Sequence, residues 1–335
     1  MKKHIIILAG GPSSEHEVSL KTADEIIKNL DPRKYLAHKI VVTKNGQWLM
    51  PQSAAGLVSN SPRDLILSEK QALGSIKNKN ISVVFIAMHG EYGEDGKIQG
   101  LLDIAGIPYT GSGVLASALG MDKARSASIL RDAGFFVPDF LELNDAITSV
   151  NDVFKKIKFP LVVKPSDRGS SVGVGIVRNK RDFATAVKKA KKFSKRVMVQ
   201  RFIDGREITC GVLERVGKLI ALPPVEIKPM ADKFYDYKSK YQEGGSEHVI
   251  PPKASPSLLN LIKNQALLAH KIIGCSGMSR SDFILDKNNK PYFLEINTIP
   301  GMTKTSLLPE SARAAGISFP RVLDLIIRSS FKNKT

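Results

Sequence analysis

The sequence predicts a protein of mixed α/β and α+β class, built from three units. In the first third, apolar runs typical of buried strands alternate with amphipathic segments of helical period, an order that indicates an open parallel sheet with covering helices. Short strands separated by glycine-rich turns then predict a small central α+β unit over residues 112–203 and a larger α+β unit over residues 204–335. A chain of 335 residues is long enough for two or three compact units with sizeable cores.

The first unit, residues 1–111, is predicted to contain strands at 4–9, 35–43 and 81–88 and a helix at 14–30. Ser14 and Glu17 have the spacing of a capping box at the start of that helix. In an open α/β sheet, ligands bind beyond the carboxyl ends of the strands. The loops 10–15 (GGPSSE) and 89–96 (HGEYGEDG) occupy such positions, so both are candidate ligand loops.

The second unit begins with a helix that contains Lys123 and ends at Gly134, and strands follow at 159–164, 174–177 and 196–202. Between the first two of these strands lies the loop 164–173 (KPSDRGSSVG), which is not a Walker A sequence. Glycines and serines in such a loop can line a phosphate site, although a Gly-Ser turn alone is more often structural. Lys164 ends a buried strand and needs an anionic partner. Together these features favour a flexible lid over a triphosphate.

The third unit contains the most informative segment, 279–303, which predicts a β-hairpin with its turn between Asn288 and Asn289. That turn places Asp282 opposite Glu295 and Arg280 opposite Asn297, and the alternation of side chains puts all four on one face. The other face carries five apolar side chains that are predicted to be core: Phe283, Leu285, Tyr292, Leu294 and Ile296.

Two facing carboxylates repel each other, so this hairpin needs a compensating positive charge. Magnesium is the economical answer, because it binds one or two carboxylates and fills its remaining positions with substrate phosphates and water. The alternative is a solvated charged face in which Arg280 is a salt-bridge partner. The strongly apolar second face and the Gly-Met-Thr exit loop favour the metal site over that alternative.

Composition excludes several other classes of protein. A net charge of +18 suggests nucleic-acid binding, but the basic run 188–196 continues an amphipathic helix, and no nucleic-acid module is present. We therefore expect anionic small molecules and no nucleic acid as partners. No stretch approaches the ~20 apolar residues that span a bilayer, so we expect no membrane partner. Two cysteines are too few for a disulfide framework and indicate a reducing cytoplasm.

Long segments resemble the D-alanine–D-alanine ligases of the ATP-grasp superfamily almost from end to end. The resemblance is carried by GGPSSEHEVSL, HGEYGEDGKIQGLLDIAGIPYTGSGVLASALGMDK, FPLVVKPSDRGSSVGV, FYDYKSKY, GCSGMSRSDF and LEINTIPGMTKTSLLP. It implies the ATP-grasp fold, with ATP as co-substrate and two Mg²⁺ ions, for which Mn²⁺ can substitute. ATP would phosphorylate one D-alanine, and the amine of a second would attack the acyl phosphate to give a dipeptide for peptidoglycan precursors. Members of this family are commonly homodimers, although no interface signature is visible here.

The resemblance assigns roles to individual residues. It implies metal binding by Asp282, Glu295 and Asn297, and it places Arg280 and the Gly301 N–H at the transferred phosphoryl group and the oxyanion. Lys123, Lys164 and Lys240 match phosphate-binding lysines, and Glu207 matches the acid that binds the ribose. Glu15 and His89 match residues at the first D-alanine, where Ser170 and Tyr241 join Glu15 to close the site. Ser306 and the Leu307 backbone match the cradle for the second carboxylate.

One segment departs from the family pattern. The family usually has Glu-Lys before the aromatic residue beside adenine, whereas this chain reads Gln200-Arg201-Phe202-Ile203. A neutral amide still accepts a hydrogen bond from the adenine amino group, and backbone contacts at Arg201 and Ile203 need no particular side chain. Nucleotide binding should survive, while its strength and base preference are open.

Two other readings stay open. The acceptor could be D-serine or D-lactate, although the Lys240-Tyr241 pair argues against D-lactate because ligases that make the ester lack that pattern. The chain could instead be a non-enzymatic protein that binds nucleotide or nucleic acid. The intact acids, lysines and arginine argue against that second reading.

Overall fold

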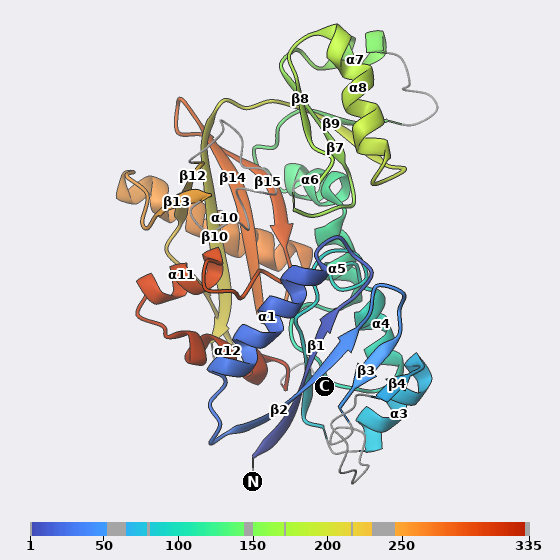
Figure 1. The fold of residues 1–335 in the computed structure, drawn as a ribbon. Coiled ribbons are helices and arrows are strands. Elements are labelled where there is room, and N and C mark those ends of the chain that lie inside the picture. The colour runs from blue at the N-terminus through green and yellow to red at the C-terminus, as the bar shows by residue number, and fades with distance from the viewer. Residues whose placement is uncertain are drawn as a thin grey trace.

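The computed structural model describes residues 2–51, 65–78, 81–143, 150–170, 172–215, 217–229 and 245–331. Three sheets lie along the molecule, with the N-terminal sheet at one end, the smallest sheet at the other and the largest between them (Figure 1). In the described part of the chain, no helix combines the length and apolar character needed to cross a membrane.

The N-terminal sheet has the strand order β4-β3-β2-β1-β5. Its strands are β1 (Lys3–Gly10), β2 (Tyr35–Val42), β3 (Trp48–Met50), β4 (Leu65–Leu67) and β5 (Val83–Ile86). Residues 5–8 of β1 are buried on both faces, which explains their unbroken apolar sequence. The predicted parallel pairing holds for β1 with β2 and β5, but β3 and β4 add an antiparallel edge, so the sheet is mixed.

The helices of this unit are α1 (His16–Asn29), α3 (Glu69–Asn78) and α4 (Lys97–Ile104). The predicted capping box of α1 is wrong, because the helix begins at His16 and Glu15 is its N-cap residue. The Ser13 hydroxyl accepts from the Glu15 N–H at 3.1 Å and makes the turn instead. Glu15 makes no side-chain capping bond, so its carboxylate is available for contacts outside the helix.

The central sheet, in the order β6-β9-β7-β8, contains β6 (Phe140–Leu143), β7 (Leu161–Pro165), β8 (Gly175–Val177) and β9 (Val197–Arg201). Helices α7 (Val150–Lys156) and α8 (Lys180–Lys191) pack on it and close a separate small core. Phe183, Ala186 and Ala190 are the buried side of α8, while its lysines are on the opposite side. The lysine-rich run is therefore the outer side of an amphipathic helix, as predicted.

The largest sheet has the order β13-β12-β10-β14-β15, with β11 paired to β10. Its strands are β10 (Gly205–Arg215), β11 (Lys218–Ala221), β12 (Val225–Pro229), β13 (Ser246–Val249), β14 (Met278–Asp286) and β15 (Pro291–Asn297). The helices α5 (Val114–Met121), α6 (Lys123–Asp132) and α10 (Pro256–Ile273) share a core with this sheet. The division at residues 111 and 203 stays a prediction. Helices α5 and α6 pack against β15, and α6 also contacts β6 of the central sheet.

The last helices, α11 (Leu307–Ala314) and α12 (Phe319–Ser329), join the N-terminal unit to the largest sheet. Val322, Leu323 and Ile326 of α12 belong to the same apolar core as β1 and β5. The Tyr35 hydroxyl donates to Asp324 at 2.8 Å across this junction. These contacts fix the position of the N-terminal unit relative to the largest sheet.

The hairpin of β14 and β15 contains both predicted pairs, Arg280 opposite Asn297 and Asp282 opposite Glu295. Its turn is centred on Asn288 and not between Asn288 and Asn289 as predicted, since Leu285 lies opposite Pro291. A β-bulge then shifts the pairing, so that Phe283 lies opposite Phe293. Phe293 is consequently fully buried, while Tyr292 and Leu294 are half-buried. The prediction of Tyr292 and Leu294 as core is therefore wrong, because an extra residue in one strand reverses the alternation beyond it.

Candidate functional site

Two cavities meet at the polar face of the hairpin. The larger, about 350 Å³, lies between the central sheet and the largest sheet, and the smaller, about 80 Å³, lies between the N-terminal loops and the segment after β15. Asp282, Glu295 and Ile227 line both cavities. The carboxylates thus stand where two ligands in neighbouring cavities would meet.

The structure brings the predicted residues that it describes to these two cavities. The larger cavity is lined by the residues predicted for the nucleotide: Lys123, Lys164, Gln200, Arg201, Phe202, Ile203 and Glu207. The smaller cavity is lined by the residues predicted to act at the amino-acid substrates and the oxyanion, and by one predicted metal ligand, Asn297. These residues are Glu15, His89, Ser170, Arg280, Asn297, Gly301, Ser306 and Leu307. Lys240 and Tyr241 lie outside the described residues, so their roles stay predictions.

Asp282 is only 5% exposed and is held from several sides. Arg280 donates to its two oxygens at 2.9 and 2.8 Å, which is the bidentate fork typical of strong arginine–carboxylate pairs. Thr209 donates to Oδ1 at 2.6 Å, and Asn297 Nδ2 donates to Oδ2 at 3.2 Å. The orientation of the carboxylate is therefore set by neighbours on β10, β14 and β15.

Glu295 has a cationic partner of its own, because Lys123 Nζ lies 3.2 Å from Glu295 Oε2. Lys123 also donates to the Arg168 carbonyl at 2.6 Å, which connects the hairpin to the loop after β7. Each facing carboxylate is thus compensated by a basic side chain. The repulsion between the two carboxylates therefore does not by itself require a metal ion. Arg280 is an ion-pair partner of Asp282, as the alternative interpretation of the hairpin expected.

The donor set nevertheless fits a hard divalent cation. Among the described residues no three Asp, Glu, His or Cys side chains converge, so the third oxygen ligand of a cation held here would be an amide. Asn297 turns its Nδ2 toward Asp282, which leaves Oδ1 as an acceptor beside two carboxylates. All-oxygen ligands and a neighbouring phosphate cavity are what magnesium prefers.

Apolar residues that the sequence analysis did not assign to a ligand site complete the larger cavity. Val162, Val172 and Val174 line it from the central unit, and Ile284 and Leu294 line it from the hairpin. Leu294 faces this cavity because of the bulge, which no regular alternation would reveal. A flat aromatic group such as a base would therefore lie between aliphatic side chains from two sheets.

Two loops close around the Glu15 carboxylate, the one after β5 and the one after β7. Ser170 of the lid loop donates to it, and Ser170 has a positive φ of 53° that turns its side chain inward. A Cβ at Gly90 or Gly169 would stand 2.5 or 2.9 Å from Glu15 Oε2, so only glycine allows this approach. The predicted contact between Ser170 and Glu15 is confirmed.

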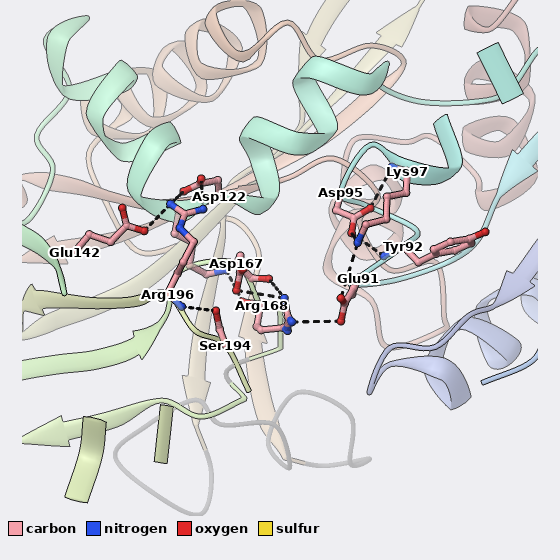
Figure 2. A network of polar contacts seen from close by, with 11 residues as sticks. Glu91, Tyr92, Asp95, Lys97, Asp122, Glu142, Asp167, Arg168, Ser194 and Arg196 are labelled. Atoms are coloured by element: carbon pink, nitrogen blue, oxygen red, sulfur yellow. Dashed lines mark hydrogen bonds and ion pairs between the residues drawn. The ribbon is translucent and has the colours of Figure 1, made fainter. Parts of the chain in front are cut away.

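Figure 2 shows a second connection between the lid loop and the N-terminal unit. Arg168 Nη2 lies 3.4 Å from Glu91, which belongs to the loop after β5. Nearby, Arg196 of the central unit pairs with Asp122 at 2.6 Å, just before α6. The lid loop is therefore in contact with the N-terminal unit, and the central unit is in contact with the segment before α6.

His89 is 4% exposed and lies beside Glu15 in the smaller cavity. Burial lowers its pKa below the ordinary value, while the Glu15 charge opposes that shift. Thr22 Oγ1 lies 2.9 Å from His89 Nε2 and fixes the ring. At neutral pH the imidazole is thus uncharged.

Glu94 is a site residue that the sequence did not single out. Its carboxylate accepts from the Gly90 N–H at 2.7 Å and from the Ile299 N–H at 3.2 Å, so it joins the loop after β5 to the segment after β15. Burial, followed by the charge of Glu15, raises the pKa of Glu94 to about 8. Its position in a loop at a strand end was the only signal in the sequence.

Replacing Glu94 with glutamine should remove a pH dependence of stability. The pKa of Glu94 is raised from an ordinary 4.5 to about 8, so the unfolded chain releases this proton first as pH rises. The contribution to stability is therefore fully present below pH 4.5 and is lost as pH rises through about 8. Urea unfolding of both proteins across this range should show a fall in the wild type that Glu94→Gln lacks; parallel curves would contradict the assignment.

The far side of the smaller cavity is formed by the segment after β15. Ser306 is the N-cap residue of α11, and its Oγ accepts from the Thr303 N–H at 2.9 Å. A Cβ at Gly301 would meet that Oγ at 2.8 Å, so the segment is closely folded. Ser306 and Leu307, at the start of α11, line the cavity, and the N-terminus of a helix suits a carboxylate.

The fold and these cavities define a phosphoryl-transferring enzyme in which a nucleotide site opens onto a second site for small amino-containing acids. Family models agree with this class. The model described as D-ala D-ala ligase N-terminus matches residues 4–112, and the one described as D-ala D-ala ligase C-terminus matches residues 129–328. The chain belongs to the D-alanine–D-alanine ligase family and has its ATP-grasp fold.

Individual relatives cover the chain almost completely. It is 41% identical to a D-alanine–D-alanine ligase of Pelotomaculum thermopropionicum, over 98% of this chain and 96% of that protein. A Bacillus anthracis D-alanine–D-alanine ligase, solved in complex with ATP, is 35% identical with a TM-score of 0.79, covering 99% and 98%. The VanG D-Ala:D-Ser ligase of Enterococcus faecalis is 29% identical with a TM-score of 0.81, covering 98% and 100%.

Proposed function

We propose that this protein is an ATP-dependent D-alanine–D-alanine ligase, which forms D-alanyl-D-alanine, ADP and phosphate for peptidoglycan precursors. The observation that carries the proposal is the meeting of the two cavities at Asp282 and Glu295. A triphosphate in the larger cavity would place its terminal phosphoryl group beside a carboxylate in the smaller one. Catalysis of phosphoryl transfer is mainly positioning and electrostatic stabilisation, which is what this arrangement supplies.

In the first half of the reaction, Glu15 binds the ammonium of the first D-alanine, and the uncharged His89 lies beside it. Lys123, Lys164 and, outside the described residues, Lys240 bind the nucleotide phosphates. Glu207 accepts from the ribose hydroxyls. Asp282, Glu295 and Asn297 would hold two Mg²⁺ ions, or Mn²⁺ as a substitute, and these supply positive charge to the phosphates.

In the second half, the amine of the second D-alanine attacks the acyl phosphate and phosphate leaves. Ser306 and the Leu307 N–H hold the carboxylate of this second substrate at the start of α11. The Arg280 guanidinium and the Gly301 N–H stabilise the oxyanion of the tetrahedral intermediate. Ser170 and Tyr241, with Glu15, keep the lid closed and exclude water from the acyl phosphate.

A D-serine acceptor is the second candidate, because the VanG D-Ala:D-Ser ligase shares this fold at 29% identity. The more similar Pelotomaculum protein, at 41%, is a D-alanine–D-alanine ligase, which favours D-alanine. Product mass spectrometry with D-alanine, D-serine and D-lactate in competition would separate these acceptors. A dominant mixed product would overturn the choice of D-alanine.

D-alanine should stimulate the release of phosphate from ATP by this protein, with one D-alanyl-D-alanine formed for each phosphate. The reason is that the acyl phosphate can form only when a carboxylate occupies the smaller cavity. L-alanine is the matched control and should give no stimulation. Equal phosphate release with and without D-alanine would reject the proposed function.

A cytoplasmic location is part of this proposal, since ATP is available there and both Cys210 and Cys275 are free thiols. The substrates are small molecules, with no nucleic acid and no membrane as partner. We also propose a homodimer, on the ground of family membership alone.

A further inference from the structure

Gln200 lies on β9 with its side chain toward the larger cavity. Its neighbour across the sheet, Val162 on β7, lines the same cavity. Gln200 is only 2% exposed, so its carboxamide cannot exchange hydrogen bonds with bulk water. Whatever it bonds must come from the protein or from a ligand.

Lys164 determines which way this amide is turned. Its Nζ donates to Gln200 Oε1 at 3.0 Å. Because an ammonium has only donors, a flipped amide would set two donors against each other. The amide nitrogen is therefore directed away from Lys164, and among the described residues Nε2 has no hydrogen-bond partner.

We propose that Gln200 reads position 6 of the bound purine and lets the site accept a 6-oxopurine nucleoside triphosphate as well as ATP. This inference rests on the proposed function, which takes the larger cavity to be the nucleotide site. Adenine offers an amino donor at position 6, and Gln200 Oε1 has a second lone pair to accept it. A 6-oxopurine offers a carbonyl acceptor, which satisfies the buried Nε2 donor.

A carboxylate at this position would act differently. It would offer acceptors only, so it would favour the amino group of adenine and repel the carbonyl of a 6-oxopurine. The aliphatic side chains of Val174, Ile284 and Leu294, which line the same cavity, contact the faces of a base and do not distinguish the two purines. Among the described residues that line this cavity, the amide of Gln200 is therefore the side chain suited to both adenine and a 6-oxopurine.

The test compares ATP with inosine triphosphate, which differs from ATP by a carbonyl and the associated N1 proton. Calorimetric titration of the full chain with each Mg²⁺-nucleotide should give dissociation constants within about ten-fold of each other. In Gln200→Glu, the affinity for inosine triphosphate relative to ATP should fall by about 10- to 100-fold, the usual effect of one unmatched buried hydrogen bond. D-alanine-dependent phosphate release with the two nucleotides should change in the same ratio.

Gln47→Glu is the matched control, since it makes the same change of charge at an exposed residue between β2 and β3 and should leave the ratio unchanged. Two results would overturn the inference. One is a wild-type protein that binds ATP more than about ten-fold more tightly than inosine triphosphate. The other is a ratio that Gln200→Glu does not alter, which would mean that the backbone at Arg201 and Ile203 selects the base. If neither nucleotide binds, the proposed function fails as well.

Discussion

Replacing Arg280 with alanine should reduce kcat by roughly 100- to 1,000-fold, the usual effect of losing one group that stabilises transition-state charge. The guanidinium lines the smaller cavity beside Asp282, which lines both cavities, and a guanidinium held in a fixed position suits the oxygens of a phosphoryl group. It also holds Asp282, whose side chain is only 6% exposed. Loss of that partner should lower the free energy of unfolding by roughly 3 kcal/mol.

The two effects can be separated with Arg280→Lys. Lysine keeps the positive charge beside Asp282 but lacks the fork, so stability should recover more than turnover. Arg33→Ala is the matched control, because Arg33 also pairs in a bidentate manner, with Asp31, but is 88% exposed. Steady-state kinetics and chemical denaturation measure both quantities. A kcat for Arg280→Ala close to that of the wild type would contradict the role of Arg280.

Glu295→Gln should abolish most turnover, by roughly 100-fold or more, and should raise the Mg²⁺ concentration needed for half-maximal activity. Glutamine keeps the size of the side chain but removes one of the two carboxylate charges that face each other across β14 and β15. It also removes the anionic partner of Lys123, 3.2 Å away, so that lysine loses its fixed position at the phosphates.

Titration of activity with MgCl₂ at saturating ATP and D-alanine measures this effect. Glu17→Gln serves as control, because Glu17 pairs with Lys44 at 3.5 Å while both side chains are largely exposed, and such a pair contributes little. If Glu295→Gln turned over near the normal rate at low Mg²⁺, the assignment of Glu295 as a metal ligand would be wrong.

Local pattern was sufficient for much of this site. An Asn-Asn turn and period-two alternation predicted the pairing of Asp282 with Glu295 and of Arg280 with Asn297, and both pairs are present because a bulge compensates for a turn that is centred on Asn288. The same reasoning failed beyond Asp282, because it assumes regular pairing and a bulge places Phe293 in the core. The capping box of α1 failed for a related reason: the turn before the helix is stabilised by Ser13, at a position that the pattern did not consider.

Glu94 shows what local pattern cannot provide. Its role depends on N–H groups of Gly90 and Ile299, and the second lies 205 positions along the chain from Glu94. The cations that face the acids are a similar case, since the approach of Lys123 to Glu295 follows from the packing of α6 against β15. Such contacts depend on how separate units pack, and no short segment contains that information.

The sequence by itself therefore determined the family, about half of the strands and the acidic face of the hairpin, because motifs and side-chain alternation are properties of continuous segments. Tertiary structure alone decided which cations compensate the charges of Asp282 and Glu295, and that the bulge directs Leu294 toward the larger cavity. It also brings Ser170 to Glu15, which is 155 positions away in the chain. It also left the Gln200 donor buried without a described partner. The physical reason is that charge compensation, burial and hydrogen bonding are set by neighbours in space, which three packed sheets bring together.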